Sequence, residues 1–246
     1  MKALNDVGIK ENDDIFIHSN ESVFGAPGHD LSIMNYYNAL IECFFQAVGS
    51  NGTVLMPTYT FSYIENEKYS PSTSTSLSGT LTEIFRKRKT SLRSLHPLYS
   101  ITAEGKNAKY YTKLDDTTSF GSKSFFAKLH AQNAKILFFG APFSSIKYIH
   151  YIEHSNQIFY FKTKTISGTT VVNQKEHENE FTYFSPPSDG SVVYDFFKLE
   201  EHLVENNFLK RIPLGKGWVK CAAAQQIANE IGRKLSENPQ FLLKTW

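Results

Sequence analysis

Asp14-Ile15-Phe16-Ile17-His18-Ser19 is a run of three apolar residues that ends in a polar pair. Such a run, flanked by polar residues, predicts a buried strand that leads into a polar turn. Apolar residues at helical spacing follow in Met34 to Val48. Gly52 to Thr58 predicts a second strand, which is entered through an Asn-Gly turn and stopped by Pro57. A strand, a helix and a strand in this order are typical of an α/β sheet.

The alternation of strands and helices continues along the chain. Tyr69 to Ser78 is dense in serine and threonine and predicts a loop, whereas Gly79 to Arg88 has helical character and a basic last turn that suits the helix dipole. Lys135 to Phe139 predicts a third strand. Near the end of the chain, the pattern predicts helices over Asp195 to Glu205 and Val219 to Leu235.

A different pattern separates the third strand from these last helices. Strand-like alternation occurs in three segments, Phe159 to Thr165, Thr169 to Asn173 and Glu180 to Phe184, and predicts a small antiparallel section. Strands mixed with crossover helices point to a three-layer arrangement, and no repeat or linker divides the chain. We therefore expect residues 1–246 to form a single α/β domain, a three-layer α/β/α fold with a small antiparallel β section.

Composition excludes several classes of protein. Of the 246 residues, 41% are hydrophobic and 14% aromatic, which is too apolar for a disordered chain. The longest apolar runs are far shorter than the roughly 20 residues that span a bilayer. Met1 to Asp14 is charged and lacks the apolar core of a signal peptide, so we expect a cytoplasmic protein that neither inserts into membranes nor binds nucleic acid.

The cysteines and histidines do not predict a metal site. Cys43 lies in an apolar helix-like run and Cys221 begins an alanine-rich segment that we expect to be helical, so both cysteines fit small core residues of a reducing compartment. No Cys-x-x-Cys spacing occurs. His150 and His154 are the only histidine pair at helical spacing, and no third ligand accompanies them, so we predict no metal.

Tyr148-Ile149-His150-Tyr151-Ile152-Glu153 carries the strongest chemical signal. A histidine and a glutamate three residues apart lie on one side of a helix, close enough for a hydrogen bond. This is the spacing of a general base and the residue that orients it. An ordinary surface pair has the same spacing, so the motif alone does not decide between the two.

Further motifs occur in order along the chain. They are His18-Ser19 with Ser22 and Gly25, Pro57-Thr58-Tyr59-Thr60, Ser76 with Gly79 and Glu83-Ile84-Phe85-Arg86, Arg93-Ser94-Leu95-His96-Pro97, and Phe120-Gly121 with Ser124. Together with His150-x-x-Glu153, this series resembles the aminoglycoside 3-N-acetyltransferase family. The resemblance covers roughly residues 13 to 165 and weakens in the C-terminal third.

The resemblance implies a domain of that family's fold and direct transfer of an acetyl group from acetyl-coenzyme A (acetyl-CoA) to an amine. His150 would be the general base, because a neutral imidazole can accept the proton that an attacking amine loses. Glu153 would hold the ring in the correct tautomer, and His96 would assist the base or shape the pocket. Many relatives also have an acid six residues before the histidine, where this chain has Ser144.

By the same analogy, polar residues at the strand ends would bind the acetyl-CoA cosubstrate. The implied contacts are His18, Ser19, Thr58, Tyr59, Ser76, Arg93 and Ser94. His18 also suits structural work at its loop. Arg93 is the candidate phosphate contact, since a guanidinium binds two oxygens at once, although a salt bridge is the alternative. The basic run Arg86 to Lys89 could meet a phosphate or simply be a solvated helix end. No P-loop or dinucleotide fingerprint is present.

The acceptor is predicted from charge. The chain carries a net charge of +2, has one acidic run, Glu176 to Glu180, and contains 13 tyrosines and 20 phenylalanines. A polycation calls for an acidic cleft. Some members of the resembled fold family acylate amino groups of nucleotide-linked sugars for surface polysaccharides such as lipopolysaccharide, and an anionic diphosphate with a stackable base suits a neutral-to-basic, aromatic pocket. The resemblance and the charge together therefore imply the amine of a nucleotide-linked 3-amino- or 4-amino-deoxy sugar. The alternatives are an aminoglycoside antibiotic and a non-catalytic binding relative. Whether the chain forms a homodimer stays open.

Overall fold

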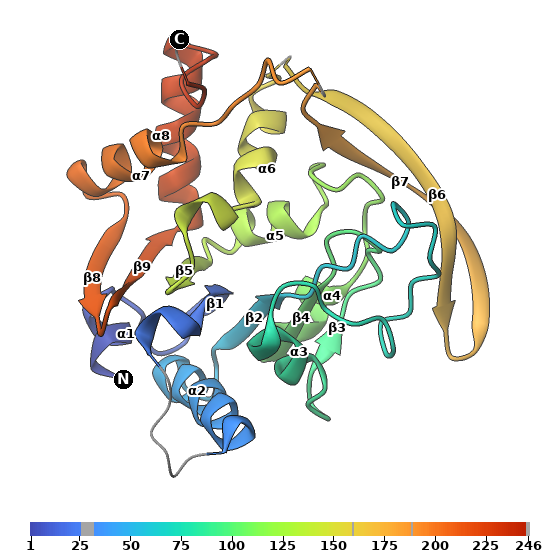
Figure 1. Cartoon of the computed structure of the whole chain (residues 1–246), viewed down its shortest axis with the longest axis horizontal. Helices are drawn as coiled ribbons and strands as arrows, with labels where there is room; N and C mark the ends of the chain where they lie inside the picture. The colour runs from blue at the N-terminus through green and yellow to red at the C-terminus, as the bar shows by residue number, and fades with distance from the viewer. Residues whose placement is uncertain (26–31, 159, 188, 245–246) are drawn as a thin grey trace.

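The computed structural model describes residues 1–25, 32–158, 160–187 and 189–244. Its centre is a sheet with the strand order β3-β4-β2-β1-β5-β9-β8 (Figure 1). The central strand β1 (Asp14–Ser19) is parallel to both of its neighbours, β2 (Thr53–Pro57) and β5 (Lys135–Phe139). These are the three strands predicted from the sequence, and their carboxyl ends lie along the same edge of the sheet.

Antiparallel strands extend the sheet on both sides of this parallel centre. Beyond β2 lie β4 (Ile101–Gly105) and β3 (Leu92–Arg93). Beyond β5 lie β9 (Gly217–Ala223) and β8 (Lys210–Leu214). The pairing of the end of β4 with the start of β2 needs a glycine, because Gly105 has φ +126° and a Cβ there would come within 2.4 Å of the Gly52 carbonyl oxygen.

Three helices cover one face of the sheet: α1 (Lys2–Asp6), α2 (Ile33–Val48) and α3 (Thr80–Arg86). Side chains alternate along a strand, so Ile15 and Ile17 of β1 point to this face. They are fully buried in one cluster with Phe44 of α2 and Phe85 of α3. The start of α2 is fixed by Ser32, whose hydroxyl accepts a hydrogen bond from the Asn35 N–H at 3.2 Å.

Five helices lie on the other face: α4 (Ala108–Thr112), α5 (Phe125–Ala131), α6 (Tyr148–Ser155), α7 (Phe196–Glu205) and α8 (Ala224–Glu237). Phe16 of β1 points to this side and is buried in a cluster with Ile149 and Ile152 of α6 and Ile227 of α8. Apolar layers on both faces confirm the predicted three-layer α/β/α fold.

The predicted antiparallel section is a long hairpin, β6 (Lys162–Val172) and β7 (Lys175–Ser185), which curves away from the sheet (Figure 1). Its turn residues Asn173 and Gln174 have positive φ, as a two-residue hairpin turn requires. The section has two strands where we expected three segments, because β6 continues through Gly168, which breaks the apolar alternation and lies against the ring of Tyr63. Phe159, the expected first residue, lies outside the described residues.

The predicted helix over Val219 to Leu235 is wrong in its first third. Residues 217–223 form β9, which pairs with β5 from Lys135↔Ala223 to Phe139↔Val219, and the helix begins only at Ala224. Alanine favours helices in isolation, but here burial between two strands decides the structure. Cys221 therefore lies in a strand, where burial raises the pKa of its thiol to about 12. It is a buried core residue, as expected.

Several short elements gave no clear pattern in the sequence. They are β3, β4, α4, α5, β8 and the 3-10 turns Glu21–Phe24 and Phe143–Ser145. Among the described residues no helix is long and apolar enough to cross a membrane. The organisation of residues 1–246 as one domain stays a prediction.

Candidate active site

The carboxyl ends of the parallel strands define the place where a ligand would bind. The chain leaves β1 through α2 on one face of the sheet, whereas it reaches β5 through α4 and α5 on the other face. The connections thus diverge at the end of β1, and such a point opens a crevice in α/β sheets. His18 and Ser19 end β1 and Pro57 ends β2, so their side chains lie at this crevice.

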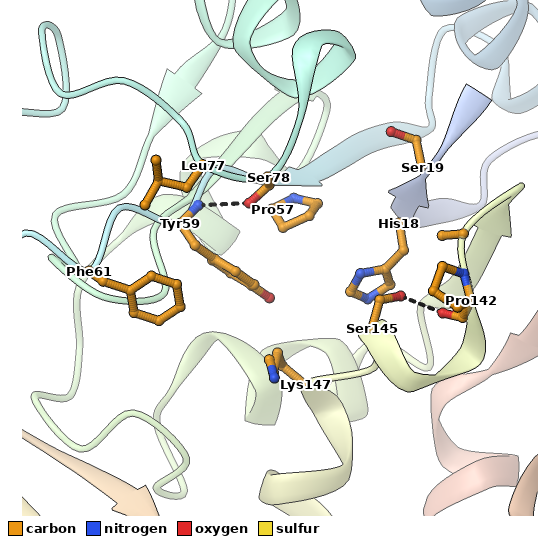
Figure 2. A pocket seen from close by; sticks show the side chains of 11 residues that line it. His18, Ser19, Pro57, Tyr59, Phe61, Leu77, Ser78, Pro142, Ser145 and Lys147 are labelled. Carbon is orange, nitrogen blue, oxygen red and sulfur yellow. Dashed lines mark hydrogen bonds between the residues drawn. The ribbon is translucent and has the colours of Figure 1, made fainter. Parts of the chain in front are cut away.

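A pocket of about 360 Å³ occupies the crevice. Its walls are His18, Ser19, Pro57, Tyr59, Phe61, Leu77, Ser78, Ala141, Pro142, Ser145 and Lys147. Figure 2 shows the His18 ring, the Tyr59 phenol and the Lys147 side chain turned toward the space between them. The lining is mostly apolar with a few polar groups, which suits a long organic ligand.

Two polar groups at the pocket have no hydrogen-bond partner among the residues that the structure describes. His18 Nε2 and the Tyr59 hydroxyl are both buried, and neither makes a hydrogen bond within the described residues. Burial, assisted by the charge of Lys147, lowers the pKa of His18 to about 3, and burial raises the pKa of Tyr59. His18 is therefore neutral and Tyr59 protonated at neutral pH. Buried unpaired groups are costly, so both are candidates for contacts with a bound molecule.

The predicted base, His150, does not line this pocket but lies one helical turn from a residue that does. Helix α6 begins directly after Lys147, which lines the pocket, and His150 follows one turn later with its N–H bonded to the Lys147 carbonyl at 3.1 Å. His150 Nδ1 lies 2.8 Å from Glu153 Oε2. The His150 side chain is 15% exposed and that of Glu153 only 1% exposed. The pair is therefore a half-buried dyad and not a solvated surface pair.

The Glu153 carboxylate has two further partners, both of them tyrosines. The Tyr160 hydroxyl donates to Oε1 at 3.0 Å, and the Tyr194 hydroxyl lies 2.9 Å from Oε1 and 3.1 Å from Oε2. A carboxylate only accepts, so the hydrogen between it and His150 belongs to Nδ1. This assignment leaves Nε2 with its lone pair, which is the tautomer that a general base needs.

Aromatic side chains connect the dyad to the pocket. The Phe120 ring lies 5.3 Å from His150 and 5.1 Å from Tyr99, and Tyr99 lies 5.4 Å from Tyr59 in the pocket wall. Phe161 also contacts His150, at 5.5 Å between ring centroids. The base is thus surrounded by apolar surface, which weakens competition from water around a reacting amine.

The seven predicted cofactor contacts fall into two groups. His18, Ser19 and Tyr59 line the pocket. The other hydroxyl residues do not line the pocket, and their hydroxyls are bonded within the protein. The Thr58 hydroxyl bonds to that of Thr102, the Ser76 hydroxyl to that of Thr82, and the Ser94 hydroxyl to the Ile101 N–H. This geometry favours a role in shaping the loops of the pocket for the second group.

Arg93 belongs to the second group. Its guanidinium donates to the backbone carbonyls of Thr58 at 2.6 Å, Ser74 at 2.5 Å and Pro71 at 3.2 Å, and it stacks over Tyr69 at 5.3 Å. The described structure shows no salt bridge for Arg93, and its Nε is buried without a hydrogen-bond partner among the described residues, so the phosphate contact stays a prediction. Arg93 ties three loop segments together beside the pocket.

His96 is also used within the protein. Its Nδ1 accepts from the Leu98 and Tyr99 N–H groups at 3.2 and 3.1 Å, so Nε2 carries the hydrogen and donates to the Ser119 hydroxyl at 3.1 Å. Burial lowers the pKa of His96 to about 3. Both ring nitrogens are occupied, which favours the pocket-shaping alternative over assistance to the base.

Two other sequence features can now be placed. Ser144 is exposed in the turn before α6, and the further hydrogen-bond partners of Glu153 in the described structure are the hydroxyls of Tyr160 and Tyr194. In the basic run, Arg86 and Lys87 pair with Glu83, and Arg88 pairs with Glu104. Arg86 is buried and its charge is used within the protein, whereas Lys87 is exposed as a residue of a solvated helix end would be.

Sequence reasoning missed several residues that build the site. Lys147 could have been found from the sequence, because it lies one helical turn before His150. Phe61, Leu77 and Ser78 lie in loops without a periodic pattern, and Tyr194 lies 41 residues after Glu153, so no local signal marked them. Among the described residues, no group of three histidine, cysteine, aspartate or glutamate side chains could hold a metal ion.

A mostly apolar crevice with a few polar groups, close to a histidine–glutamate pair, is an arrangement that suits transfer of a group to a proton-bearing nucleophile. The sequence model of the aminoglycoside 3-N-acetyltransferase family matches residues 17–236. The chain therefore belongs to this family, and it is an N-acetyltransferase that uses acetyl-CoA as cosubstrate. A search of curated proteins found no match.

Solved structures share the fold. A structure described as AAC-IIIb binary with CoASH has a TM-score of 0.82 and 20% sequence identity, and the match covers 100% of this chain and 96% of that one. Aminoglycoside acetyltransferase AAC(3)-IIb has a TM-score of 0.81 at 19% identity, covering 96% and 95%. AAC-VIa bound to sisomicin has a TM-score of 0.79 at 18% identity, also covering 96% and 95%.

These comparisons overturn one prediction. The nucleotide-linked amino sugar of surface polysaccharides is wrong as the acceptor, because the matching family model and the structural neighbours are aminoglycoside acetyltransferases. The physical error was to infer the acceptor from the net charge of +2, which sums over the whole surface, whereas binding depends on the groups beside the reacting amine.

Proposed function

We propose that this protein transfers the acetyl group of acetyl-CoA to an amine of an aminoglycoside. The single observation that carries the proposal is the His150–Glu153 dyad, at 2.8 Å, beside a pocket at the strand ends of a chain of this family. The cytoplasmic location stays a prediction, and whether the chain forms a homodimer stays open.

The pocket fits the pantetheine arm of acetyl-CoA. This arm carries amide groups along an otherwise apolar chain, and the lining offers the unpartnered His18 Nε2 and Tyr59 hydroxyl within mostly apolar walls. Ser19 and Ser78 add hydroxyls, and Lys147 adds a positive group at the same pocket. When bound, acetyl-CoA supplies an acyl carbon activated as a thioester.

The dyad supplies the base. His150 Nε2 accepts the proton of the acceptor amine while Nδ1–H stays bonded to Glu153, and the carboxylate stabilises the imidazolium that results. The amine nitrogen bonds to the acyl carbon while the C–S bond of the thioester breaks, and coenzyme A leaves as its thiol after it takes up a proton equivalent to the one that His150 accepts. No residue therefore needs to carry the acetyl group. Cys221 is buried in β9 with a raised thiol pKa, which makes it a poor nucleophile.

The rings around His150 suit a cationic acceptor. Phe161 and Tyr194 are both partly exposed, and their ring centroids lie 5.5 and 5.9 Å from that of the imidazole. Aromatic faces attract ammonium groups, so an acceptor can be held beside the base without a dense cluster of carboxylates. This arrangement reconciles a net charge of +2 with a polycationic substrate.

The test is an acceptor panel. Purified protein is incubated with acetyl-CoA and, separately, with kanamycin, gentamicin, sisomicin and a simple amine such as glucosamine, and the free thiol of coenzyme A is followed. We expect thiol release with at least one aminoglycoside and a mass increase of one acetyl group on that molecule. Release with glucosamine alone, or with none of them, would contradict the proposal.

A further inference from the structure

The partners of the Glu153 carboxylate are a feature that the general-base scheme does not explain. Glu153 is almost fully buried, and its two oxygens receive hydrogen bonds from His150 Nδ1, the Tyr160 hydroxyl and the Tyr194 hydroxyl. A buried carboxylate is stable only when such bonds compensate for its lost hydration. The hydrogen bonds from the two tyrosines therefore affect the strength of the electrostatic interaction between the Glu153 carboxylate and the His150 ring.

Tyr194 is held in place from a distant part of the chain. Its backbone forms an antiparallel bridge with Leu243, and the flanking Asp195 N–H and Val193 carbonyl bond to Leu242 and Lys244 at 2.9 and 2.8 Å. Its ring stacks on Phe196 at 5.0 Å. The end of the chain thus fixes the hydroxyl that contacts Glu153.

We propose that Tyr194, together with Tyr160, is a positioning residue for acetyl transfer, whose hydroxyl keeps Glu153 ionised with Oε2 aimed at His150 Nδ1. The proposal rests on the proposed function only in taking His150 as the base. The Tyr194 hydroxyl also lies 3.4 Å from His150 Nδ1, but the Nδ1 hydrogen is directed at Glu153 Oε2 at 2.8 Å. Tyr194 therefore acts through Glu153 and does not contact Nε2, the nitrogen that would accept the proton.

A phenol is suited to this task. Burial and the neighbouring carboxylate both raise the pKa of Tyr194 and of Tyr160, so each hydroxyl stays protonated and donates in one direction. An arginine or lysine here would place a full positive charge beside Glu153 and cancel much of its attraction for the imidazolium. A neutral donor fixes the carboxylate and leaves that attraction largely in place.

The other groups around the dyad do not provide this compensation. On α6, Lys147 faces the pocket and His154 is exposed. On α5, His130 bonds to the Tyr148 hydroxyl, and the neighbouring Phe120 loop and β7 contribute the rings of Phe120 and Phe184. In the described parts of the chain, no lysine or arginine forms a salt bridge with Glu153.

The sign of the effect follows from proton binding. The active dyad has a neutral imidazole and an ionised carboxylate, and one additional proton inactivates it. Removing a donor from the carboxylate leaves its charge less compensated, so the additional proton binds more tightly. The acidic limb of the pH profile should move to higher pH by about one unit, because a hydrogen bond to a charged group contributes about that much.

The test compares Tyr194→Phe and Tyr160→Phe with the wild type. Each change removes one hydroxyl and keeps the ring. Tyr63→Phe is the matched control, because it removes a buried tyrosine hydroxyl that bonds to Thr170 at 2.7 Å, away from the dyad. The His150 ring is titrated by NMR in protein labelled with ¹⁵N-histidine, without any substrate, and its signal is assigned with His150→Asn.

We expect the His150 titration midpoint to rise by about one unit in Tyr194→Phe or Tyr160→Phe and to be unchanged in Tyr63→Phe. In a Glu153→Gln background, Tyr194→Phe should cause no further shift. An unchanged midpoint in both tyrosine variants, or a shift that persists without the Glu153 carboxylate, would overturn the proposal. Because the titration needs no acceptor, an absence of aminoglycoside acetylation would refute the proposed function separately.

Discussion

At the residue scale, burial distinguishes the His150–Glu153 pair from an ordinary surface pair and supports the proposed role as a base and its orienting residue. The spacing of His150 and Glu153 suggested both possibilities, and a sequence cannot distinguish them. The structure does so through the Glu153 side chain, which is 1% exposed and bonded to three donors. Burial of the carboxylate strengthens its interaction with the imidazolium that forms during the reaction.

Burial also explains why His18 and His96 stay neutral. Both lie at predicted positions near strand ends, and for both it is the loss of hydration that lowers the pKa to about 3. They differ in their partners, since His96 uses both ring nitrogens within the protein whereas His18 Nε2 has none in the described structure.

These two pKa values predict how stability depends on pH. A histidine with a depressed pKa in the folded protein binds a proton more readily when unfolded, so its contribution to stability is fully present above pH 6.5 and is lost as the pH falls toward 3. Between pH 7 and pH 5, each of the two should lower the free energy of unfolding by about 2 kcal/mol.

Urea unfolding at a series of pH values measures this effect. His96→Asn keeps an acceptor near the position of Nδ1 and should lose about 2 kcal/mol less than the wild type between pH 7 and pH 5. The exposed His177 provides the matched control, His177→Asn, which should behave as the wild type. Equal pH dependence in His96→Asn and the wild type would show that His96 is not buried in its neutral form.

At the element scale, the pocket depends on loops that Arg93 holds together. The guanidinium contacts carbonyls at Thr58, Pro71 and Ser74, so it links the end of β2 to the loop that precedes α3. The neighbouring residues Tyr59, Leu77 and Ser78 line the pocket. The position of this wall is thus set from β3, a strand of two residues that the sequence did not predict.

Arg93→Lys should therefore weaken acetyl-CoA binding more than it slows the chemical step. A lysine has one compact ammonium group and cannot reach three carbonyls in a fork, so the wall should loosen. We expect a rise of about tenfold in the Kd for acetyl-CoA, measured by calorimetry, with a smaller change in kcat. Lys89→Ala, in the basic run outside the pocket lining, serves as the control, and equal effects of the two changes would contradict this role.

The elements that the sequence predicted are those with strong local patterns. Apolar runs identified β1, β2 and β5, because these strands are buried on both faces of the sheet. Helical spacing of apolar residues identified α2 and α7, because each helix is buried on one face. The strand β9 was read as helix, because its alanines favour a helix and only pairing with β5 makes it a strand. The short β3 and β8 depend on neighbours that no local window contains.

At the scale of the whole molecule, the same limit applies to the site. The ordered sequence motifs allowed prediction of the residues that directly follow strands or share one helix, which are His18, Ser19, Tyr59 and the His150–Glu153 pair. Tyr194 reaches Glu153 only because the end of the chain folds back beside it, and this contact is not encoded by spacing. The acceptor was predicted wrongly because net charge averages over a surface on which most charges lie far from His150.

The measurement that tests the account most directly is the rate of aminoglycoside acetylation by the wild type and by His150→Asn, together with the Kd of each for acetyl-CoA. We predict that the wild type acetylates an aminoglycoside and that the variant is slower by roughly 10²- to 10⁴-fold in kcat with a similar Kd, because only the general base is lost. A folded His150→Asn variant with wild-type turnover, or a wild type that acetylates no aminoglycoside, would contradict the account.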